Sequence, residues 1–378
     1  MTPPAATVVL CPDSFKGSAS ATEAADWLAQ GWRQVRPDDT VVALGQADGG
    51  EGTAEVVAAA QPGGRWHELT VCGPDRRPVT GRWYRHGSTA TCDLAQMSGL
   101  PLMGELDPTG ATTRGLGQVI GAAVAAGCTL IQVGLGGSAS TDGGAGALAA
   151  LGWSLTDADG APVPDGGQGL TRIASLTPGD WPDEVEVLVV TDVTAPLLGP
   201  NGAAAVFGPQ KGATADDIAL LDAALAHWAT VLGGDPEAPG AGAAGGVGYG
   251  FATALGARLV PGADWVAERT GLTTLLPGAD LVVTGEGRFD ATSWTGKVTG
   301  SVLTAVGDAT RSAVVAGQVS PDAARPGLTM IALSELAGSS EAALADPQRW
   351  LVRAGSALAE GFEPPSVHCG HGRTHPGR

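Results

Sequence analysis

The chain holds only three lysines among its 21 basic residues, at Lys16, Lys211 and Lys297. Each has a glycine neighbour, in the segments SFKGS, PQKGA and TGKV. An ammonium group is a compact charge on a flexible stem, and in a glycine-flanked loop it can reach a phosphate oxygen closely. We therefore expect at least two of these lysines to contact phosphate. The alternative is that a GC-rich coding bias left three lysines by chance.

Polar residues follow three apolar runs at the point where each run ends. They are Asp13 and Ser14 after residues 7–11, Asp192 after residues 185–191, and Glu286, Arg288 and Asp290 after residues 280–284. Because the carboxyl ends of parallel strands share one edge of a sheet, we expect these side chains to converge there. Converging carboxylates repel one another unless they are protonated or hold Mg²⁺.

Together with Lys16 and Lys297, these residues predict a phosphoryl-transfer site in which one aspartate accepts the proton of a substrate hydroxyl. Asp192 and Asp290 are the candidates for that base, and neither is preferred. Helix N-capping is the structural alternative for one or two of the acidic residues.

The segment DGG occurs twice, each time after a predicted strand and before a predicted helix. The first copy is Asp48, Gly49 and Gly50, followed by Glu51, and the second is Asp142, Gly143 and Gly144. Such turns leave backbone N–H groups free at a helix N-terminus, where the helix dipole favours an anion. We predict that both loops bind phosphate or carboxylate, while an ordinary loop is the alternative for either copy.

The segment GLGGSA at 134–139 fits the loose dinucleotide pattern GxGxxA and contains Ser138, a further candidate phosphate contact. This pattern raises the alternative of an NAD-dependent oxidoreductase acting on a small hydroxy acid. The following residues, STDGG, prolong the loop instead of beginning a helix, which disfavours that alternative. No Walker A motif is present either, because Val298 follows Lys297.

Short apolar runs alternate with alanine-rich stretches of helical spacing along most of the chain. The runs lie at 7–11, 40–44, 129–134, 185–191, 280–284, 312–316 and 329–333, and the clearest helical stretches at 20–35, 115–126 and 297–306. Continuous apolar runs of this length suit strands buried on both faces. The alternation predicts an α/β fold with a Rossmann-like, doubly wound parallel sheet.

Two stretches break this alternation, and we expect them to form a second, inserted mixed α/β domain. Residues 65–92 have the pattern of an antiparallel meander, and residues 196–259 contain one long amphipathic helix at 215–232. The inserted domain would comprise 67–113 and 193–263, and the Rossmann-like domain 1–66, 114–192 and 264–362. Residues 363–378, with three histidines and Cys369, are expected to be a flexible tail.

The net charge of −18 excludes several classes of partner. A surface this acidic repels nucleic acid and anionic membranes, so an anionic substrate must be neutralised locally by cations, N–H groups or a metal ion. The first residues lack the basic and apolar segments of a secretory signal, which predicts a cytoplasmic location. The five cysteines share no CxxC spacing and are expected to be free thiols.

Six segments resemble, in order, the motif blocks of the bacterial glycerate kinase family. They are CPDSFKGSASATEAA, QADGGEGT, GLGGSASTDGGAGALAALG, TDVTAPLLGPNGAAAVFGPQKGA, PGAGAAGGVGYGFATALGARLVPG and VVTGEGRFDATSWTGKV, within about residues 8–317. The resemblance implies a two-domain α/β enzyme that uses ATP and Mg²⁺ to phosphorylate D-glycerate to 2-phosphoglycerate. All three lysines lie inside these blocks. The segment after Gly317 and the block CDLAQMSGL depart from the family pattern.

The resemblance also suggests roles for individual residues. Lys16 and Lys297 would stabilise charge on the transferred group, and the DGG loops would hold phosphate or carboxylate. Arg114, just before a predicted helix, is a candidate clamp for the glycerate carboxylate, with a simple surface role as its alternative. A homodimer and a non-catalytic sugar-acid-binding protein both stay open, and the sequence assigns no metal ligands.

Overall fold

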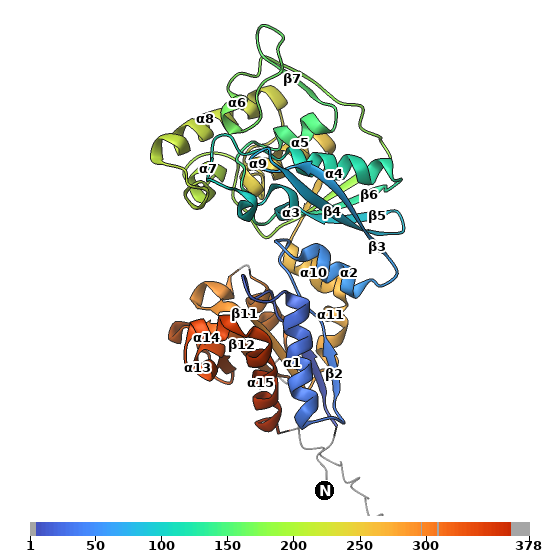
Figure 1. Cartoon of the computed structure of the whole chain (residues 1–378), viewed down its shortest axis with the longest axis vertical. Coiled ribbons are helices and arrows are strands. Elements are labelled where there is room, and N and C mark those ends of the chain that lie inside the picture. The colour runs from blue at the N-terminus through green and yellow to red at the C-terminus, as the bar shows by residue number, and fades with distance from the viewer. Residues whose placement is uncertain (1–4, 296, 308–309, 364–378) are drawn as a thin grey trace, which may run out of the picture.

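The computed structural model describes residues 5–295, 297–307 and 310–363. Two lobes follow one another along the longest axis of the molecule (Figure 1). The lower lobe in that view contains both the beginning and the end of the described chain, and the upper lobe contains the middle. The histidines of the expected tail and Cys369 lie outside the described residues.

The lower lobe is built on a parallel sheet of five strands in the order β13-β12-β11-β1-β2. The strands are β1 (Thr7–Leu10), β2 (Thr40–Ala43), β11 (Leu281–Phe289), β12 (Arg311–Val319) and β13 (Thr329–Ala332). From β1 the chain passes to β2 on one side, and it returns to β11 on the other. The sheet therefore has its topological switch point between β1 and β11, where open α/β sheets bind ligands.

Helices cover both faces of this sheet, as a doubly wound fold requires. Helices α1 (Ala21–Val35), α13 (Leu333–Ala337), α14 (Ser340–Ala345) and α15 (Pro347–Glu360) lie on one side, and α11 (Leu272–Leu275) and α12 (Val298–Ala305) on the other. Along β1, Val8 and Leu10 pack in the α1–α15 core, whereas Val9 and Cys11 pack with α11 and α12. The run is apolar throughout because its alternate residues enter two different cores.

The upper lobe is built on a mixed sheet of six strands in the order β10-β9-β6-β5-β4-β3. The strands β3 (Arg65–Cys72), β4 (Pro78–His86) and β5 (Thr89–Asp93) form the expected antiparallel meander. Strands β6 (Leu130–Gly134), β9 (Glu186–Val190) and β10 (Arg258–Val260) continue the sheet in parallel. The strands β7 (Ser154–Thr156) and β8 (Ser175–Thr177) form a separate two-stranded antiparallel sheet.

The upper lobe contains the largest apolar core, and helices pack around its sheet. The longer helices are α4 (Arg114–Ala125), α8 (Ala215–Leu232) and α9 (Ala243–Leu255), and α8 coincides with the predicted amphipathic helix. The shorter ones are α3 (Ala95–Ser98), α5 (Ala145–Ala150), α6 (Gly167–Leu170) and α7 (Ala203–Phe207). Helices α2 (Thr53–Ala60) and α10 (Gly262–Thr270) lie between the lobes (Figure 1).

The sequence analysis assigned residues 114–192 to the Rossmann-like sheet, and the strand pairing corrects this assignment. Strand β6 pairs with β5 of the meander and with β9, so both β6 and β9 belong to the six-stranded sheet. An apolar run shows that a strand is buried on both faces, but it does not encode which strand lies beside it. The α/β class with a parallel sheet and a mixed sheet is confirmed.

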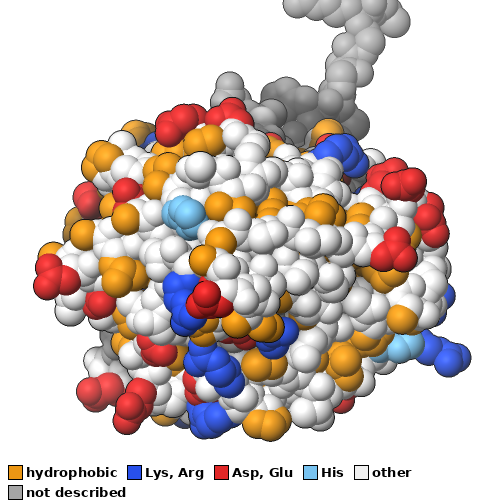
Figure 2. Space-filling model, turned by 90° about the horizontal axis from the view of Figure 1, so that it is seen from above, with side chains coloured by type: hydrophobic (Ala, Val, Ile, Leu, Met, Phe, Trp, Pro, Cys, Tyr) orange, Lys and Arg blue, Asp and Glu red, His pale blue; other side chains and the backbone are white. Residues whose placement is uncertain are grey.

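On the face of the molecule seen from above, acidic side chains are spread along the left and right edges and the top of the view (Figure 2). This distribution agrees with the net charge of −18. None of the helices in the described part of the chain combines the length and apolar character that a membrane span requires.

Helices α1 and α15 pack closely in the lower lobe, and a glycine substitution tests this contact. A Cβ atom at Gly355 of α15 would lie 2.2 Å from the carbonyl oxygen of Leu28 in α1. We expect Gly355→Ala to lower the free energy of unfolding by about 1–3 kcal/mol, because the helices must move apart. Urea denaturation measures this change.

The matched control is Gly121→Ala in α4, where the new Cβ would lie 3.6 Å from its nearest neighbour, Leu151. This substitution should raise the free energy of unfolding by up to about 1 kcal/mol, through helix propensity alone. Equal effects of the two substitutions would contradict the packing described here.

Candidate functional site

The loop after β1 lies at the switch point of the five-stranded sheet. The backbone N–H of Asp13 donates to the carbonyl oxygen of Gly285 at 2.8 Å, which continues the pairing of β1 with β11 beyond the strand. The N–H of Ser14 donates to the Asp13 carboxylate at 2.6 Å. Asp13 and Lys16 are therefore held at the carboxyl end of β1, beside β11.

Strand β11 continues to Phe289, five residues beyond the predicted run, so Glu286 and Arg288 are strand residues. Glu286 is buried, and its Oε1 atom has no hydrogen-bond partner among the described residues. Its Oε2 atom lies 3.6 Å from Nζ of Lys297, the residue that precedes α12. This edge therefore holds a buried carboxylate that only one cation partly neutralises.

These residues line a cavity of about 460 Å³ at the carboxyl edge of the sheet. The cavity brings together seven of the residues predicted from the sequence: Asp13, Ser14, Lys16, Asp48, Glu286, Arg288 and Lys297. Gly317 and Gln318 of β12 and side chains of α13 and α14 complete its wall. The prediction that strand-end polar groups converge is thus reproduced for the β1 and β11 edges.

The electrostatics of this cavity are dominated by its acidic side chains. Burial, followed by the negative charges of Asp48 and Glu286, raises the pKa of Asp13 to about 7, against the opposing effects of Ser14 and Lys16. A carboxyl with this pKa exchanges its proton near neutral pH, as a general base must. Within the described residues, no cluster of three His, Cys, Asp or Glu side chains could hold a metal ion by itself.

A second cavity, of about 700 Å³, adjoins the first and shares Ser14, Lys16 and Ser18 with it. Its walls come from the loop and helix after β1 and from Glu51, Glu55 and Pro101 on the side of α2 and the upper lobe. In the part of the chain that the structure describes, the Lys16 ammonium makes no hydrogen bond or ion pair. Lys16 therefore lies between two adjoining cavities without a salt-bridge partner among the described residues.

The first DGG loop approaches the site, but its amides are partly occupied. The carboxylate of Asp48 accepts from the N–H of Gly50 at 2.9 Å, and Gly49 packs against the carbonyl of Val190. The N–H groups of Gly52 and Ala54 both donate to Asp93 at 3.0 Å. The anion held at the N-terminus of α2 is thus a carboxylate of the protein itself.

Asp93 is a residue whose role the sequence analysis did not identify. It is fully buried at the end of β5, and this burial raises its pKa to about 7 despite the two N–H donors. The sequence offered only a weak signal, because the residues before Asp93, TATC, do not form a continuous apolar run. The residue fastens the first DGG loop to the six-stranded sheet.

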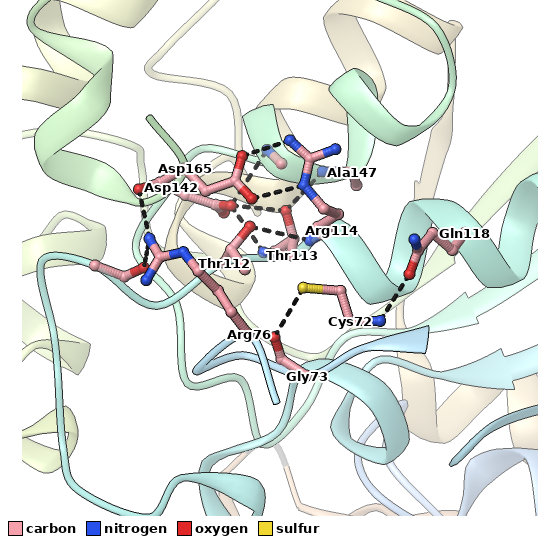
Figure 3. A network of polar contacts seen from close by, with 12 residues as sticks. Cys72, Gly73, Arg76, Thr112, Thr113, Arg114, Gln118, Asp142, Ala147 and Asp165 are labelled. Carbon is pink, nitrogen blue, oxygen red and sulfur yellow. Dashed lines mark hydrogen bonds and ion pairs between the residues drawn. The ribbon is translucent and has the colours of Figure 1, made fainter. Parts of the chain in front are cut away.

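The second DGG loop lies inside the upper lobe and borders neither cavity (Figure 3). Asp142 is buried and accepts from the N–H and the hydroxyl of Thr113, both at 2.8 Å, and from the N–H of Gly144. Burial raises the pKa of Asp142 against these hydrogen bonds. The carbonyl of Gly143 accepts from the indole of buried Trp228. The second DGG loop therefore connects α4 and α5 with α8. The sequence analysis predicted that it binds the phosphate or carboxylate of a ligand, but here it holds a carboxylate of the protein.

Arg114 is engaged within the same region of the upper lobe (Figure 3). Its guanidinium makes two hydrogen bonds of 2.6 Å to the carboxylate of Asp165, and these raise its pKa. Both residues line a separate cavity of about 270 Å³. Arg114 thus has a bidentate carboxylate partner, as predicted for a clamp, but this partner belongs to the protein.

Lys211 and Ser138 line neither of the two adjoining cavities. Lys211 is completely buried, and its ammonium donates to the hydroxyl of Ser138 at 2.9 Å and to the carbonyl of Ser140. Burial lowers the pKa of Lys211 to about 7. The structure therefore separates this lysine from the other two: it ends the 3₁₀ helix η2 (Pro209–Lys211), and its ammonium binds the loop that follows β6.

The two aspartates predicted as bases both cap helical segments. Asp192 accepts from the N–H groups of Gly262 and Ala263 at the start of α10, while burial raises its pKa to about 6. Asp290 begins the 3₁₀ helix η4 (Ala291–Trp294), and hydrogen bonds from Thr292 lower its pKa. Neither residue lines the cavity of about 460 Å³.

Comparisons with known proteins agree on one family. The model of the glycerate kinase family matches residues 8–363. The glycerate kinase of Bacillus subtilis is 42% identical over 302 residues, which cover 77% of this chain and 79% of that protein. The glycerate 2-kinase of Escherichia coli is 41% identical over 303 residues, with the same coverage.

A solved structure resembles the whole fold. The crystal structure titled "putative glycerate kinase 2" from Salmonella typhimurium LT2 matches with a TM-score of 0.78 and 35% sequence identity. The match covers 94% of this chain and 98% of that one. Both lobes therefore have counterparts in that structure.

The raised pKa of Asp13 predicts a pH-dependent stability. The pKa of an unfolded aspartate is about 3.9, whereas that of native Asp13 is about 7. The native state therefore loses stability relative to the unfolded state as the pH rises above about 3.9, and this loss is complete above about pH 7. We expect Asp13→Asn to stabilise the protein, by roughly 2–4 kcal/mol more at about pH 8 than at about pH 5. Denaturant unfolding of both proteins at the two pH values measures this; a constant difference would refute it.

The Arg114–Asp165 pair predicts a structural effect. We expect Arg114→Gln to lower the free energy of unfolding by about 1–3 kcal/mol, since it leaves a half-buried carboxylate without its bidentate partner. Arg172→Gln is the control, because Arg172 is 57% exposed, against 35% for Arg114, so its ion pair with Asp157 should contribute less than about 1 kcal/mol. Equal losses in thermal or urea unfolding would show that the partial burial of the Arg114 guanidinium is unimportant.

Proposed function

Because the chain belongs to the glycerate kinase family, we propose that it transfers the γ-phosphoryl group of ATP directly to D-glycerate. The product would be 2-phosphoglycerate, formed by in-line attack of the substrate hydroxyl. The chain is a kinase of this family; the identity of the nucleotide, the D configuration and the 2-phosphate are our proposal.

One observation carries the proposal: a carboxylate with a pKa of about 7, a lysine without a salt bridge among the described residues and a partly neutralised glutamate meet at the switch point of the sheet. Lys16 and Lys297 are positioned to balance the charge of phosphoryl oxygens. The smaller substrate would enter from the adjoining cavity of about 700 Å³, where Lys16 can also attract its carboxylate. Both substrates would then meet at Lys16.

We propose Asp13 as the base, in place of Asp192 and Asp290. Asp13 lines the cavity and titrates near neutral pH, so it can accept the hydroxyl proton and release it later. The carboxylate of Asp290 has a lowered pKa and would be a weak base, and that of Asp192 is occupied by two amides of α10.

The acidic side chains are suited to hold Mg²⁺. Magnesium commonly binds through one or two carboxylates together with the phosphates of a nucleotide. Asp48 and Glu286 would hold it here, because Oε1 of Glu286 is buried without a partner and both residues lie near Asp13. When bound, Mg²⁺ would neutralise charge on the phosphoryl oxygens.

The oxidoreductase alternative is not favoured. The 134–139 loop packs against the first DGG loop, with the N–H of Gly136 donating to Gly49, and Gly137 accepts from Leu100. Helix α5 begins only at Ala145, so no helix N-terminus directly follows the glycines as a dinucleotide site requires.

Turnover separates the kinase from a non-catalytic sugar-acid-binding protein. A cytoplasmic location and a homodimer stay proposals.

The decisive assay measures ADP release from ATP and Mg²⁺ in the presence of D-glycerate. We expect release with D-glycerate, but neither with L-glycerate nor without an acid. Phosphorus NMR of the product then distinguishes the 2-phosphate from the 3-phosphate. Folded protein that releases no ADP with any short hydroxy acid would refute the proposed activity.

Substitution of the two aspartates tests the choice of base. We expect Asp13→Asn to lower kcat by about 10²–10⁴-fold, because the amide cannot accept the proton. Asp192→Asn keeps an oxygen that can accept from α10, so kcat should change by less than about tenfold. A larger loss of kcat in Asp192→Asn than in Asp13→Asn would reverse the assignment.

A further inference from the structure

The cavity at the sheet edge changes character from one end to the other. Its charged side chains all belong to the region of β1, β11 and the residues beside them: Asp13, Lys16, Asp48, Glu286, Arg288 and Lys297. The lining from β12 and from α13 to α15 carries no charge and includes Gln318, Leu333, Ser340, Ala343, Leu344 and Pro347. A ligand that fills the cavity must therefore be anionic at one end and largely apolar at the other.

Leu344 marks the apolar end. Its relative exposure of 58% is the largest among the exposed large hydrophobic side chains of the described residues. A single exposed leucine is ordinary on a protein surface, but this one lies on a cavity wall with Leu333 and Pro347. An apolar ring that covered Leu344 would remove this surface from water, which favours binding.

Gln318 gives the same end a polar group. Its side-chain nitrogen donates to the hydroxyl of Ser340 at 2.8 Å. Within the described residues its carbonyl oxygen has no hydrogen-bond partner, so it can accept from an amino group of a ligand. A ring that carries an amino group fits an apolar wall with one such acceptor.

We propose that this uncharged end is the subsite for the adenine base of the nucleotide, with Leu344 and Gln318 as its specificity-determining residues. The inference rests on the proposed kinase function and deepens it. The base lies over β12 and α14, and the phosphates extend toward Lys16 and Lys297. The polarity of the cavity sets this direction, because the phosphates then meet both lysines.

The adjoining cavity is less suited to the base. Its large side chains are mainly charged, including Glu23, Glu51 and Glu55, and its apolar residues are small: Ala19, Ala21, Val56 and Pro101. This wall has no leucine or aromatic side chain to cover a ring. It therefore suits a small polar substrate, and the nucleotide occupies the first cavity.

The test compares two exposed leucines on helices. Leu344→Asn removes the apolar wall without adding charge, and Leu220→Asn on α8 is the control, at an exposed leucine that lines neither cavity. We expect Leu344→Asn to raise the Kd of ADP, measured by calorimetry, and the KM of ATP by about tenfold. The kcat and the KM of D-glycerate should stay within about twofold of the parent, and Leu220→Asn should change none of these values.

Inorganic tripolyphosphate distinguishes the two ends of the cavity. It lacks a base, so its inhibition constant should be the same for the parent protein and for Leu344→Asn. Gln318→Leu should reduce the preference for ATP over GTP, since it removes the acceptor for the 6-amino group of adenine, where guanine carries a carbonyl oxygen. An unchanged Kd of ADP in Leu344→Asn, or an equal weakening of ADP and tripolyphosphate, would overturn the subsite.

If the parent protein binds ADP but does not phosphorylate glycerate, the proposed function fails while the subsite is still tested by the Kd values. If the parent protein binds no ADP, the subsite fails as well.

Discussion

The pairing of β1 with β11 is the interaction on which the rest of the molecule depends. The backbone N–H of Thr7 donates to the carboxylate of Asp280, 273 positions later in the chain, and Val8 lies beside Leu281 in register. This pairing holds together the two cores that lie on either side of β1 and creates the switch point of the sheet. Asp13 and Glu286 face a common cavity only because their strands are neighbours.

The acidic residues of the molecule differ in what their oxygens bind. Asp93, Asp142 and Asp192 lie among backbone N–H donors and fasten loops or helix ends. Among the described residues, one oxygen of Glu286 has no partner, and the donor to the Asp13 carboxylate is the adjacent amide of Ser14. The carboxylates of Asp93, Asp142 and Asp192 thus accept hydrogen bonds from the protein's own backbone, whereas those of Asp13 and Glu286 have oxygens that can bind a ligand. Occupied oxygens, more than burial or raised pKa, separate structural acids from candidates for chemistry.

The sequence predicted the α/β class, the meander and the long helix α8, because hydrophobic periodicity and turn residues report on local structure. It also predicted that Asp13, Lys16, Glu286 and Lys297 converge, since the ends of parallel strands share one edge. It could not assign β6 and β9 to a sheet, because strand neighbours are set by long-range packing. It could not show that Asp142 and Arg114 have partners within the protein, because Thr113 and Asp165 meet them only in the folded upper lobe.

The interrupted lower lobe has a consequence for how the chain folds during synthesis. All six strands of the mixed sheet precede β11, so the upper lobe can complete its sheet while the lower lobe still lacks three strands. Domains generally fold as units as they emerge from the ribosome. At that stage β1 and β2 are not yet paired with β11, β12 and β13. Their apolar side chains are not yet covered by the helices that follow later in the chain. A ribosome-bound chain that stops before β11 should therefore expose this unfinished sheet to chaperones.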